Sequence, residues 1–270
     1  MPTEAIIAFL AGLLIGSFLN VCIYRLPRDL SVVGPRSYCP HCERTIAWYD
    51  NIPVLSYVLL RGRCRFCRAR IPIRYLLVEL ATGIAFAVCV VELGVSLAAL
   101  KWCIFSAILI ALIATDLEER ILPDELTLGG TLLGLVLAAF VPLDAETITL
   151  LFPPLDRRAG SVIEAAFGAA IASAAIWFVG WAYQKLRHRE ALGFGDVKMI
   201  ALMGVFLGAP NTLLAIAGGS AFGAVTSLLY IRFAHKDAST YQLPFGTFLG
   251  AGALAVAFTE EIAGRGLLSF

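Results

Sequence analysis

The long apolar runs of this sequence constrain its fold more than any other feature. They lie between short polar stretches and approach the ~20 residues with which a helix crosses the hydrocarbon core of a bilayer. The chain is 59% hydrophobic and only 15% charged, a balance too apolar for a soluble domain. We expect an all-α polytopic membrane protein with about eight transmembrane helices, at Ala5–Tyr24, Tyr75–Leu93, Leu97–Thr115, Leu126–Val141, Val162–Tyr183, Val197–Gly208, Leu213–Phe233 and Leu243–Ile262.

Basic residues predict the orientation of these helices. Ten arginines lie in the loop from Arg25 to Arg74, and seventeen of the 21 Lys and Arg residues fall on the side of that loop. Cytoplasmic loops carry such an excess, so we place this loop in the cytoplasm and both termini outside. The expected organisation is a first transmembrane helix (1–24), a cytoplasmic lobe (25–74) and a seven-helix membrane core (75–270).

Four of the seven cysteines form two pairs in the lobe. Cys39-Pro-His-Cys42 and Cys64-Arg-Phe-Cys67 each present two thiols within one turn, and two such turns can complete a tetrahedral zinc site. Thiols in the cytoplasm stay reduced, which disfavours disulfides. We therefore predict structural zinc bound by Cys39, Cys42, Cys64 and Cys67, with a redox dithiol or unliganded cysteines as alternatives.

Two acidic segments lie at the predicted cytoplasmic ends of helices. Asp116 follows the third predicted helix, and Asp196 follows two glycines, Gly193 and Gly195, where the sixth begins. Ionisable groups at a membrane boundary are costly and merit a functional hypothesis. Two facing aspartates can share one proton, so that one acts as base on water while the other polarises a carbonyl. The alternative is that they cap helices or form ion pairs, and the residues alone leave both interpretations open.

Motifs along nearly the whole chain resemble the bacterial type IV prepilin leader peptidases, which are GxGD-type aspartic proteases of the membrane. The motifs stand in the family's order: GSFLNVCIYRLPR, CPHC, WYDNIPVLSY, GRCRFC, RYLLVEL, TDLEERILPDELTL and GFGDVKM. The resemblance implies that Asp116 and Asp196 are the catalytic pair, supported by Gly193 and Gly195. Asp124 is expected to be a supporting residue, although it is also a rival for the first catalytic position.

The resemblance also implies substrates, a second activity and a location. Family members remove the leaders of prepilins and of type II secretion pseudopilins at the cytoplasmic face of the bacterial inner membrane. Those with a cysteine lobe commonly also methylate the new N-terminus from S-adenosylmethionine. Asp50 and Glu79 are our candidates for holding this cationic cofactor. Beyond substrates and lipid, pilus or secretion assembly proteins are candidate partners, and we expect no nucleic acid.

Three further expectations complete the sequence interpretation. A protease-like scaffold for pilus or secretion assembly is the main alternative function, and an ion-coupled carrier is a weaker one. Glu118 and Glu119 are hypothesised to attract a basic leader, against the simpler interpretation of a solvated acidic turn. The interval between Asp116 and Asp196 is longer than the family pattern implies, and we assign the extra length to the external loop 142–160.

Overall fold

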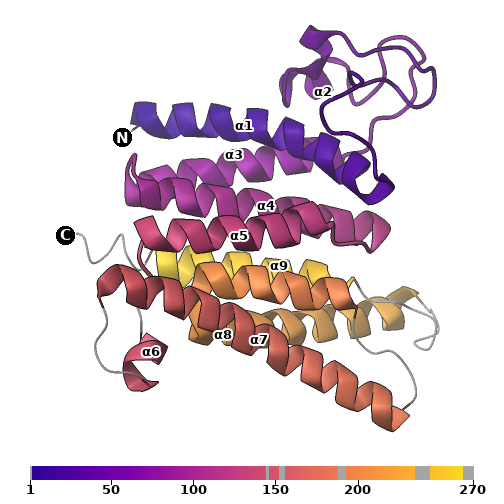
Figure 1. The fold of residues 1–270 in the computed structure, drawn as a ribbon. Coiled ribbons are helices and arrows are strands. Elements are labelled where there is room, and N and C mark those ends of the chain that lie inside the picture. The colour runs from indigo at the N-terminus through magenta and orange to yellow at the C-terminus, as the bar shows by residue number, and fades with distance from the viewer. Residues whose placement is uncertain (1, 144–145, 152–155, 188–192, 235–243, 264–270) are drawn as a thin grey trace. The chain divides into compact units, whose positions relative to one another are not determined.

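The computed structural model describes residues 2–143, 146–151, 156–187, 193–234 and 244–263, and their regular structure is helical apart from two isolated β-bridges. The chain divides into two compact units, residues 1–115 and residues 116–270, which are described separately below. Figure 1 shows the helices and the short α2 of the lobe. This division differs from the predicted organisation (1–24, 25–74, 75–270), which stays a prediction.

The first unit joins two packed helices to the cysteine lobe. Its helical elements are α1 (Pro2–Arg25), η1 (Leu26–Arg28), η2 (Trp48–Asn51), α2 (Leu55–Leu59), α3 (Arg74–Leu93) and the part of α4 (Leu97–Glu119) up to residue 115. Glycines let α1 and α3 touch backbone to backbone: a Cβ on Gly12 would lie 2.7 Å from the Thr82 carbonyl oxygen, and one on Gly16 would lie 2.7 Å from the Glu79 Cα. Small residues such as Gly12 and Gly16 allow this close packing of helices.

The second unit is a helical bundle. It contains α5 (Asp124–Phe140), α6 (Glu146–Leu151), α7 (Arg157–Arg187), α8 (Phe194–Ala234), α9 (Phe245–Val256) and η3 (Ala257–Ala263). Close packing again depends on glycine, because a Cβ on Gly204 of α8 would lie 2.5 Å from backbone atoms of α7. α9 packs against α8 in the same way, where a Cβ on Gly219 would lie 2.5 Å from the Phe248 carbonyl oxygen.

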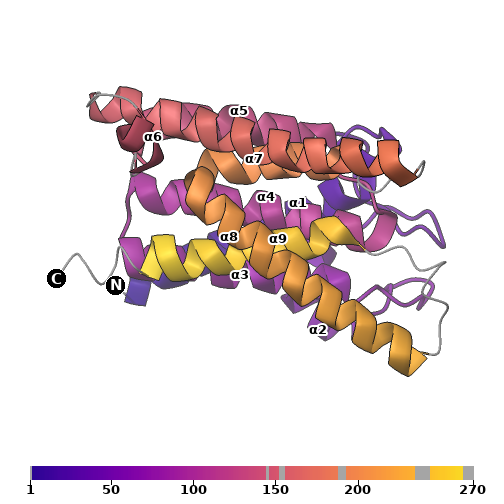
Figure 2. The same cartoon turned by 90° about the horizontal axis from the view of Figure 1, so that it is seen from below.

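A kink divides α8 into two segments. Gly208 has φ 72° and ψ 176°, which are not helical values, and Pro210 follows two residues later. The chain reverses its direction at this point (Figure 2). The two segments correspond to the sixth and seventh predicted spans, Val197–Gly208 and Leu213–Phe233.

The structure places a helix on each of the eight predicted segments. By length and composition, five helices can cross a membrane (α1, α3, α4, α7 and α8), and a shorter apolar helix covers Phe245–Glu260. The all-helical membrane fold is thereby confirmed, while the number of passes stays a prediction. Residues 144–145 and 152–155 of the loop predicted to be external, and Leu243 of the last predicted span, lie outside the described residues.

Candidate active site

Asp116 lies in the last turn of α4, where the helix ends at a left-handed residue. Arg120 has φ 56°, and its backbone N–H donates to the Asp116 carbonyl oxygen at 3.1 Å. A left-handed residue commonly terminates a helix in this way. The chain then passes through Leu122 and Pro123 into α5. The Asp116 side chain, at 6% exposure, is buried.

The start of α9 holds the Asp116 carboxyl group. The backbone N–H of Thr247 donates to Oδ2 at 2.6 Å, and the Thr247 hydroxyl donates to the same oxygen at 2.8 Å. Gly246 makes this approach feasible, because a Cβ there would lie 3.1 Å from the Asp116 Cγ. Helix N-termini attract carboxylates through their free N–H groups and the helix dipole.

The GxGD segment starts α8 and brings Asp196 into the same site. The backbone N–H of Asp196 donates to the Gly193 carbonyl oxygen at 3.1 Å. The Asp196 carboxyl interacts electrostatically with that of Asp116, so the structure brings together the two aspartates that the sequence singled out.

The two glycines of the GxGD segment differ in their surroundings. A Cβ on Gly195 would lie 3.2 Å from the Leu122 Cβ, which is tighter than ordinary packing. Among the described residues, a Cβ on Gly193 would meet only the Asp196 Oδ2, at an ordinary 3.5 Å. Gly195 therefore lets α8 approach the segment between α4 and α5. Leu122 also borders Gly246, at 3.2 Å from its hypothetical Cβ, and so lies between the two helix starts.

Asp124 is engaged elsewhere. Its Oδ1 forms a 2.6 Å ion pair with the Lys198 Nζ, and the Asp124 side chain is 57% exposed. Lys198 also lies over the ring of Phe194, 5.1 Å from its centroid. The contacts of Asp124 thus link the start of α5 to the start of α8, and its supporting role in catalysis stays a prediction.

Thr247, Gly246 and Leu122 are the site residues that sequence reasoning missed. None of these three residues carries an ionisable group that would single it out. One signal could have found the first two. The Pro244-Phe245-Gly246-Thr247 segment opens the last predicted span on the side of the membrane to which the charge tally assigns Asp116 and Asp196.

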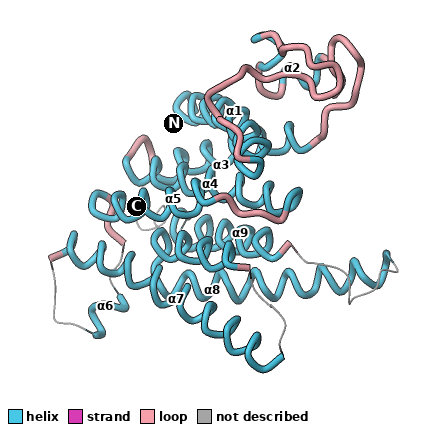
Figure 3. Tube along the Cα trace, turned by 45° about the vertical axis from the view of Figure 1, so that its right-hand side comes forward, coloured by secondary structure: helices cyan, strands magenta, loops and turns pink. Residues whose placement is uncertain are grey.

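The four predicted metal ligands converge in the lobe, which is mostly loop (Figure 3). Their four Sγ atoms lie within 4.8 Å of one another, and the Cys39 and Cys67 sulfurs are 3.7 Å apart. Zinc bound tetrahedrally at ~2.3 Å from each sulfur places sulfurs about 3.8 Å apart, so the cluster fits zinc. The pKa of the Cys64 thiol is lowered to about 7, chiefly because the Cys67 backbone N–H donates to it, and a thiolate is the form that binds metal.

The two cysteine turns have the same backbone design. In each, the first cysteine exchanges backbone hydrogen bonds with residues four and five positions later, as in Glu43 N–H to the Cys39 carbonyl at 2.8 Å and Arg68 N–H to the Cys64 carbonyl at 3.1 Å. Glu43 and Arg68 both have positive φ, 57° and 62°. A β-bridge closes each turn. The repeated CxxC pattern therefore folds twice into one local structure that aims two thiols at a common point.

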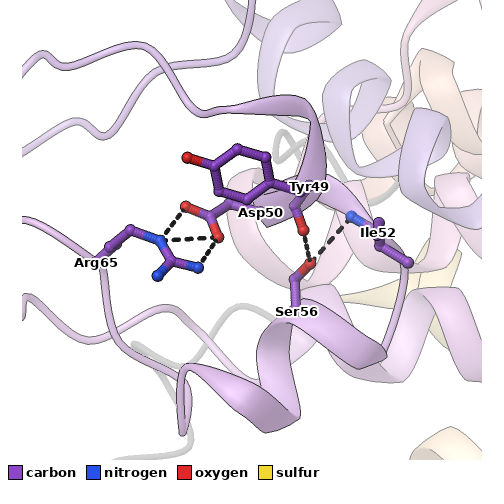
Figure 4. Close-up of polar contacts among 5 residues, drawn as sticks. All are labelled: Tyr49, Asp50, Ile52, Ser56 and Arg65. Atoms are coloured by element: carbon purple, nitrogen blue, oxygen red, sulfur yellow. Dashed lines mark hydrogen bonds and ion pairs between the residues drawn. The ribbon is translucent and has the colours of Figure 1, made fainter.

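Both candidate cofactor residues are engaged by the chain itself. The Asp50 carboxylate accepts hydrogen bonds from the Arg65 guanidinium at 2.5–3.1 Å (Figure 4). Glu79 is 8% exposed and its Oε2 accepts a 2.7 Å hydrogen bond from the Val54 backbone N–H. In this arrangement neither carboxylate is presented to a cationic cofactor, so their role in binding S-adenosylmethionine stays a prediction and we base no methyl-transfer step on them.

Fold and candidate site together define a class: a polytopic helical membrane protein with two electrostatically interacting aspartates at its helix ends and a four-cysteine lobe. Residues 10–93 match the bacterial Peptidase A24 N-terminal domain, and residues 103–228 match the type IV leader peptidase family. The chain belongs to the type IV leader peptidase family.

Relatives named prepilin leader peptidase/N-methyltransferase are similar over most of the chain. The protein of Myxococcus xanthus (strain DK1622) is 38% identical over 91% of this chain and 70% of its own length. The protein of Stutzerimonas stutzeri is 33% identical over 94% of this chain and 91% of its own length. The protein of Aeromonas hydrophila is 33% identical over 98% of this chain and 94% of its own length. No solved structure matches this chain.

Proposed function

We propose that this chain is a membrane aspartic endopeptidase that removes the leader peptides of type IV prepilins and of type II secretion pseudopilins, and that it also N-methylates the new N-terminus. The observation that carries the proposal is the pairing of Asp116 and Asp196, from α4 and α8, in one site. The names of the relatives, prepilin leader peptidase/N-methyltransferase, support the same two activities.

The proposed cleavage step uses the two carboxyls in complementary roles. Two adjacent carboxyls share one proton, because both cannot be charged at short range. The charged one takes a proton from water, and the protonated one donates a hydrogen bond to the scissile carbonyl. Both Thr247 donors bind Oδ2 of Asp116, so we assign Oδ1 to the water. Thr247 thereby fixes the plane of the carboxyl before the substrate binds.

We propose that the reaction takes place at the cytoplasmic face of the inner membrane. The excess of Lys and Arg on the lobe's side supports a cytoplasmic lobe and external termini. A prepilin has its basic leader on the cytoplasmic side of its apolar helix, so the site and the scissile bond then meet at the same boundary.

The cysteine lobe is proposed to be a zinc-stabilised structural unit. A closed site of four thiolates leaves no open position for a substrate, so zinc would act through folding rather than through the reaction. Cys39, Cys42, Cys64 and Cys67 would hold the ion. For methyl transfer, S-adenosylmethionine would supply the electrophilic methyl group.

Leader recognition is proposed to involve Glu118 and Glu119 beside the catalytic pair. Glu118 is exposed and Glu119 is half-buried, which leaves at least Glu118 within reach of a basic leader. Reversing both charges should weaken processing and make it more sensitive to leader charge. Kinetics unchanged by the double reversal would leave only the solvated acidic turn.

The decisive experiment compares wild type, Asp116→Asn and Asp196→Asn on a purified prepilin, with its mass followed with and without S-adenosylmethionine. We expect wild type to remove the leader and each folded variant to be inactive. A further mass gain of one methyl group, seen only with the cofactor, would demonstrate methylation. Normal cleavage by the variants would exclude the proposed pair and direct attention to Asp124. Inactivity of wild type on several prepilins would favour the scaffold alternative.

A further inference from the structure

The short helix α2 of the lobe buries a polar side chain and exposes apolar ones, the opposite of what a helix in water does. Ser56 is buried, and its hydroxyl donates to the Tyr49 carbonyl at 2.8 Å and accepts from the Ile52 N–H at 3.0 Å (Figure 4). Leu55, Val58 and Leu59 stand three and four residues apart, so they share one face. These three side chains are 51%, 60% and 72% exposed. We call them the α2 face.

The start of α2 lies at the level of a predicted membrane span rather than beyond its end. Val54, directly before α2, is bonded to Glu79, which stands five residues inside α3. Five residues of helix correspond to about 7 Å along its axis. Figure 1 accordingly shows α2 alongside the C-terminal part of α1. A helix that lies in the interface buries its apolar face to a similar depth, ~5–10 Å into the headgroup–acyl boundary.

The anchor at Glu79 holds a strained turn. Val54 has φ 61° and ψ −51°, a conformation that branched side chains rarely adopt. The flanking Leu55 N–H bonds back to the Pro53 carbonyl at 2.6 Å, which makes the turn tight. Strained backbone persists where its surroundings fix it. Here the buried Glu79 carboxylate of α3 fixes the turn, and the turn determines where α2 begins.

The charges around α2 match an anionic lipid surface. Residues 25–74 contain ten arginines against three acidic residues, and the exposed Arg61 and Arg63 follow α2 directly. Arginine near a membrane surface is attracted to anionic headgroups. Trp48, in the short helix that packs on α2, is 73% exposed, and tryptophan is enriched at membrane interfaces.

We propose that the α2 face inserts into the headgroup–acyl boundary of the leaflet on the lobe's side, with the neighbouring arginines on anionic lipid headgroups. This contact makes α2 a membrane anchor for the cysteine lobe, independent of the peptidase and methylation activities. The three side chains of the α2 face are exposed to a similar extent as aliphatic residues along α1, such as Leu10 at 54% and Leu14 at 64%, which belong to a predicted span.

Photo-cross-linking of the full-length protein tests the anchor. A benzophenone amino acid is introduced at position 59, at position 10 in α1 as a lipid-facing reference, and at position 45, an exposed threonine of the lobe, as the matched control. Each protein is reconstituted in phosphatidylcholine vesicles with and without phosphatidylglycerol, irradiated, and analysed by intact-protein mass spectrometry. We expect lipid adducts at positions 59 and 10 and several-fold fewer at position 45. Phosphatidylglycerol should raise the yield at position 59 but not at position 10.

Other outcomes overturn the proposal. Cross-linked dimers at position 59 in place of lipid adducts would mean that a second copy of the chain covers the α2 face. Absence of adducts at position 59 would show that the α2 face lies in water. Equal yields at positions 45 and 59 would show that the α2 face contacts lipid no more than the rest of the lobe does. A yield independent of phosphatidylglycerol would exclude the role of the arginines. Position 58 serves as a second probe on the same face if the first variant is not monodisperse.

Discussion

Replacing Thr247 with valine should impair cleavage without unfolding the protein. Valine has nearly the same shape, and it removes the 2.8 Å hydrogen bond from the hydroxyl to the Asp116 Oδ2, while the 2.6 Å bond from the backbone N–H stays. A hydrogen bond to a charged group contributes about 1.5–3 kcal/mol. If that stabilisation is exerted in the transition state, kcat/KM falls about 10- to 150-fold, since about 1.4 kcal/mol is a factor of ten.

The assay is cleavage of a purified prepilin in detergent, with initial rates over a range of substrate concentrations. Thr247→Ser keeps the hydroxyl and should stay within a few-fold of wild type. Thr226→Val is the matched control, because the Thr226 hydroxyl bonds only backbone carbonyls of its own helix in the described contacts. Activity of Thr247→Val equal to that of Thr226→Val would refute the idea that the start of α9 positions Asp116.

Three further predictions test the rest of the site. Gly195→Ala should lose most activity, because its Cβ would press on Leu122, whereas Gly193→Ala should stay close to wild type; equal loss in both would contradict the packing argument. Asp124→Asn should retain most cleavage, because an ion pair whose aspartate is 57% exposed contributes only about 0.2–1 kcal/mol, and an inactive but folded Asp124→Asn would instead make Asp124 a catalytic candidate. Elemental analysis of the purified protein should find zinc, and Cys39→Ser should lose both the zinc and thermal stability. Cys22→Ser, which changes a cysteine of α1 outside the cluster, should retain the metal. Zinc retained in Cys39→Ser would argue against the four-cysteine site.

The patterns that could be interpreted from sequence alone were local ones. Apolar run length predicted the helices, because the bilayer sets the length of a span regardless of what packs beside it. The break near Gly208 followed from glycine and proline, which act within one turn of backbone. The two CxxC turns predicted a common metal site, and the structure folds both turns in the same way. In each case the physical cause lies within a few residues.

Contacts between distant segments could not be predicted in this way. Asp124 and Asp116 are both acidic and only eight positions apart, and nothing local says that the first pairs with Lys198 while the second is buried near Asp196. Asp50 and Glu79 looked like cofactor ligands because their internal partners, Arg65 and the Val54 N–H, come from other parts of the lobe. The α2 face was likewise hidden, since a five-residue segment does not reveal which side chains are turned inward.

The sequence by itself determined the membrane class, the positions of the helices, the cysteine cluster and the family, because run length, residue type and motif order are properties of the chain. Only the tertiary structure decided which oxygen of Asp116 is held and by what. Thr247 stands 131 residues away, and its two hydrogen bonds exist because glycines let helices approach to backbone contact. Such an approach depends on the packing of several helices at once, and no local pattern encodes it.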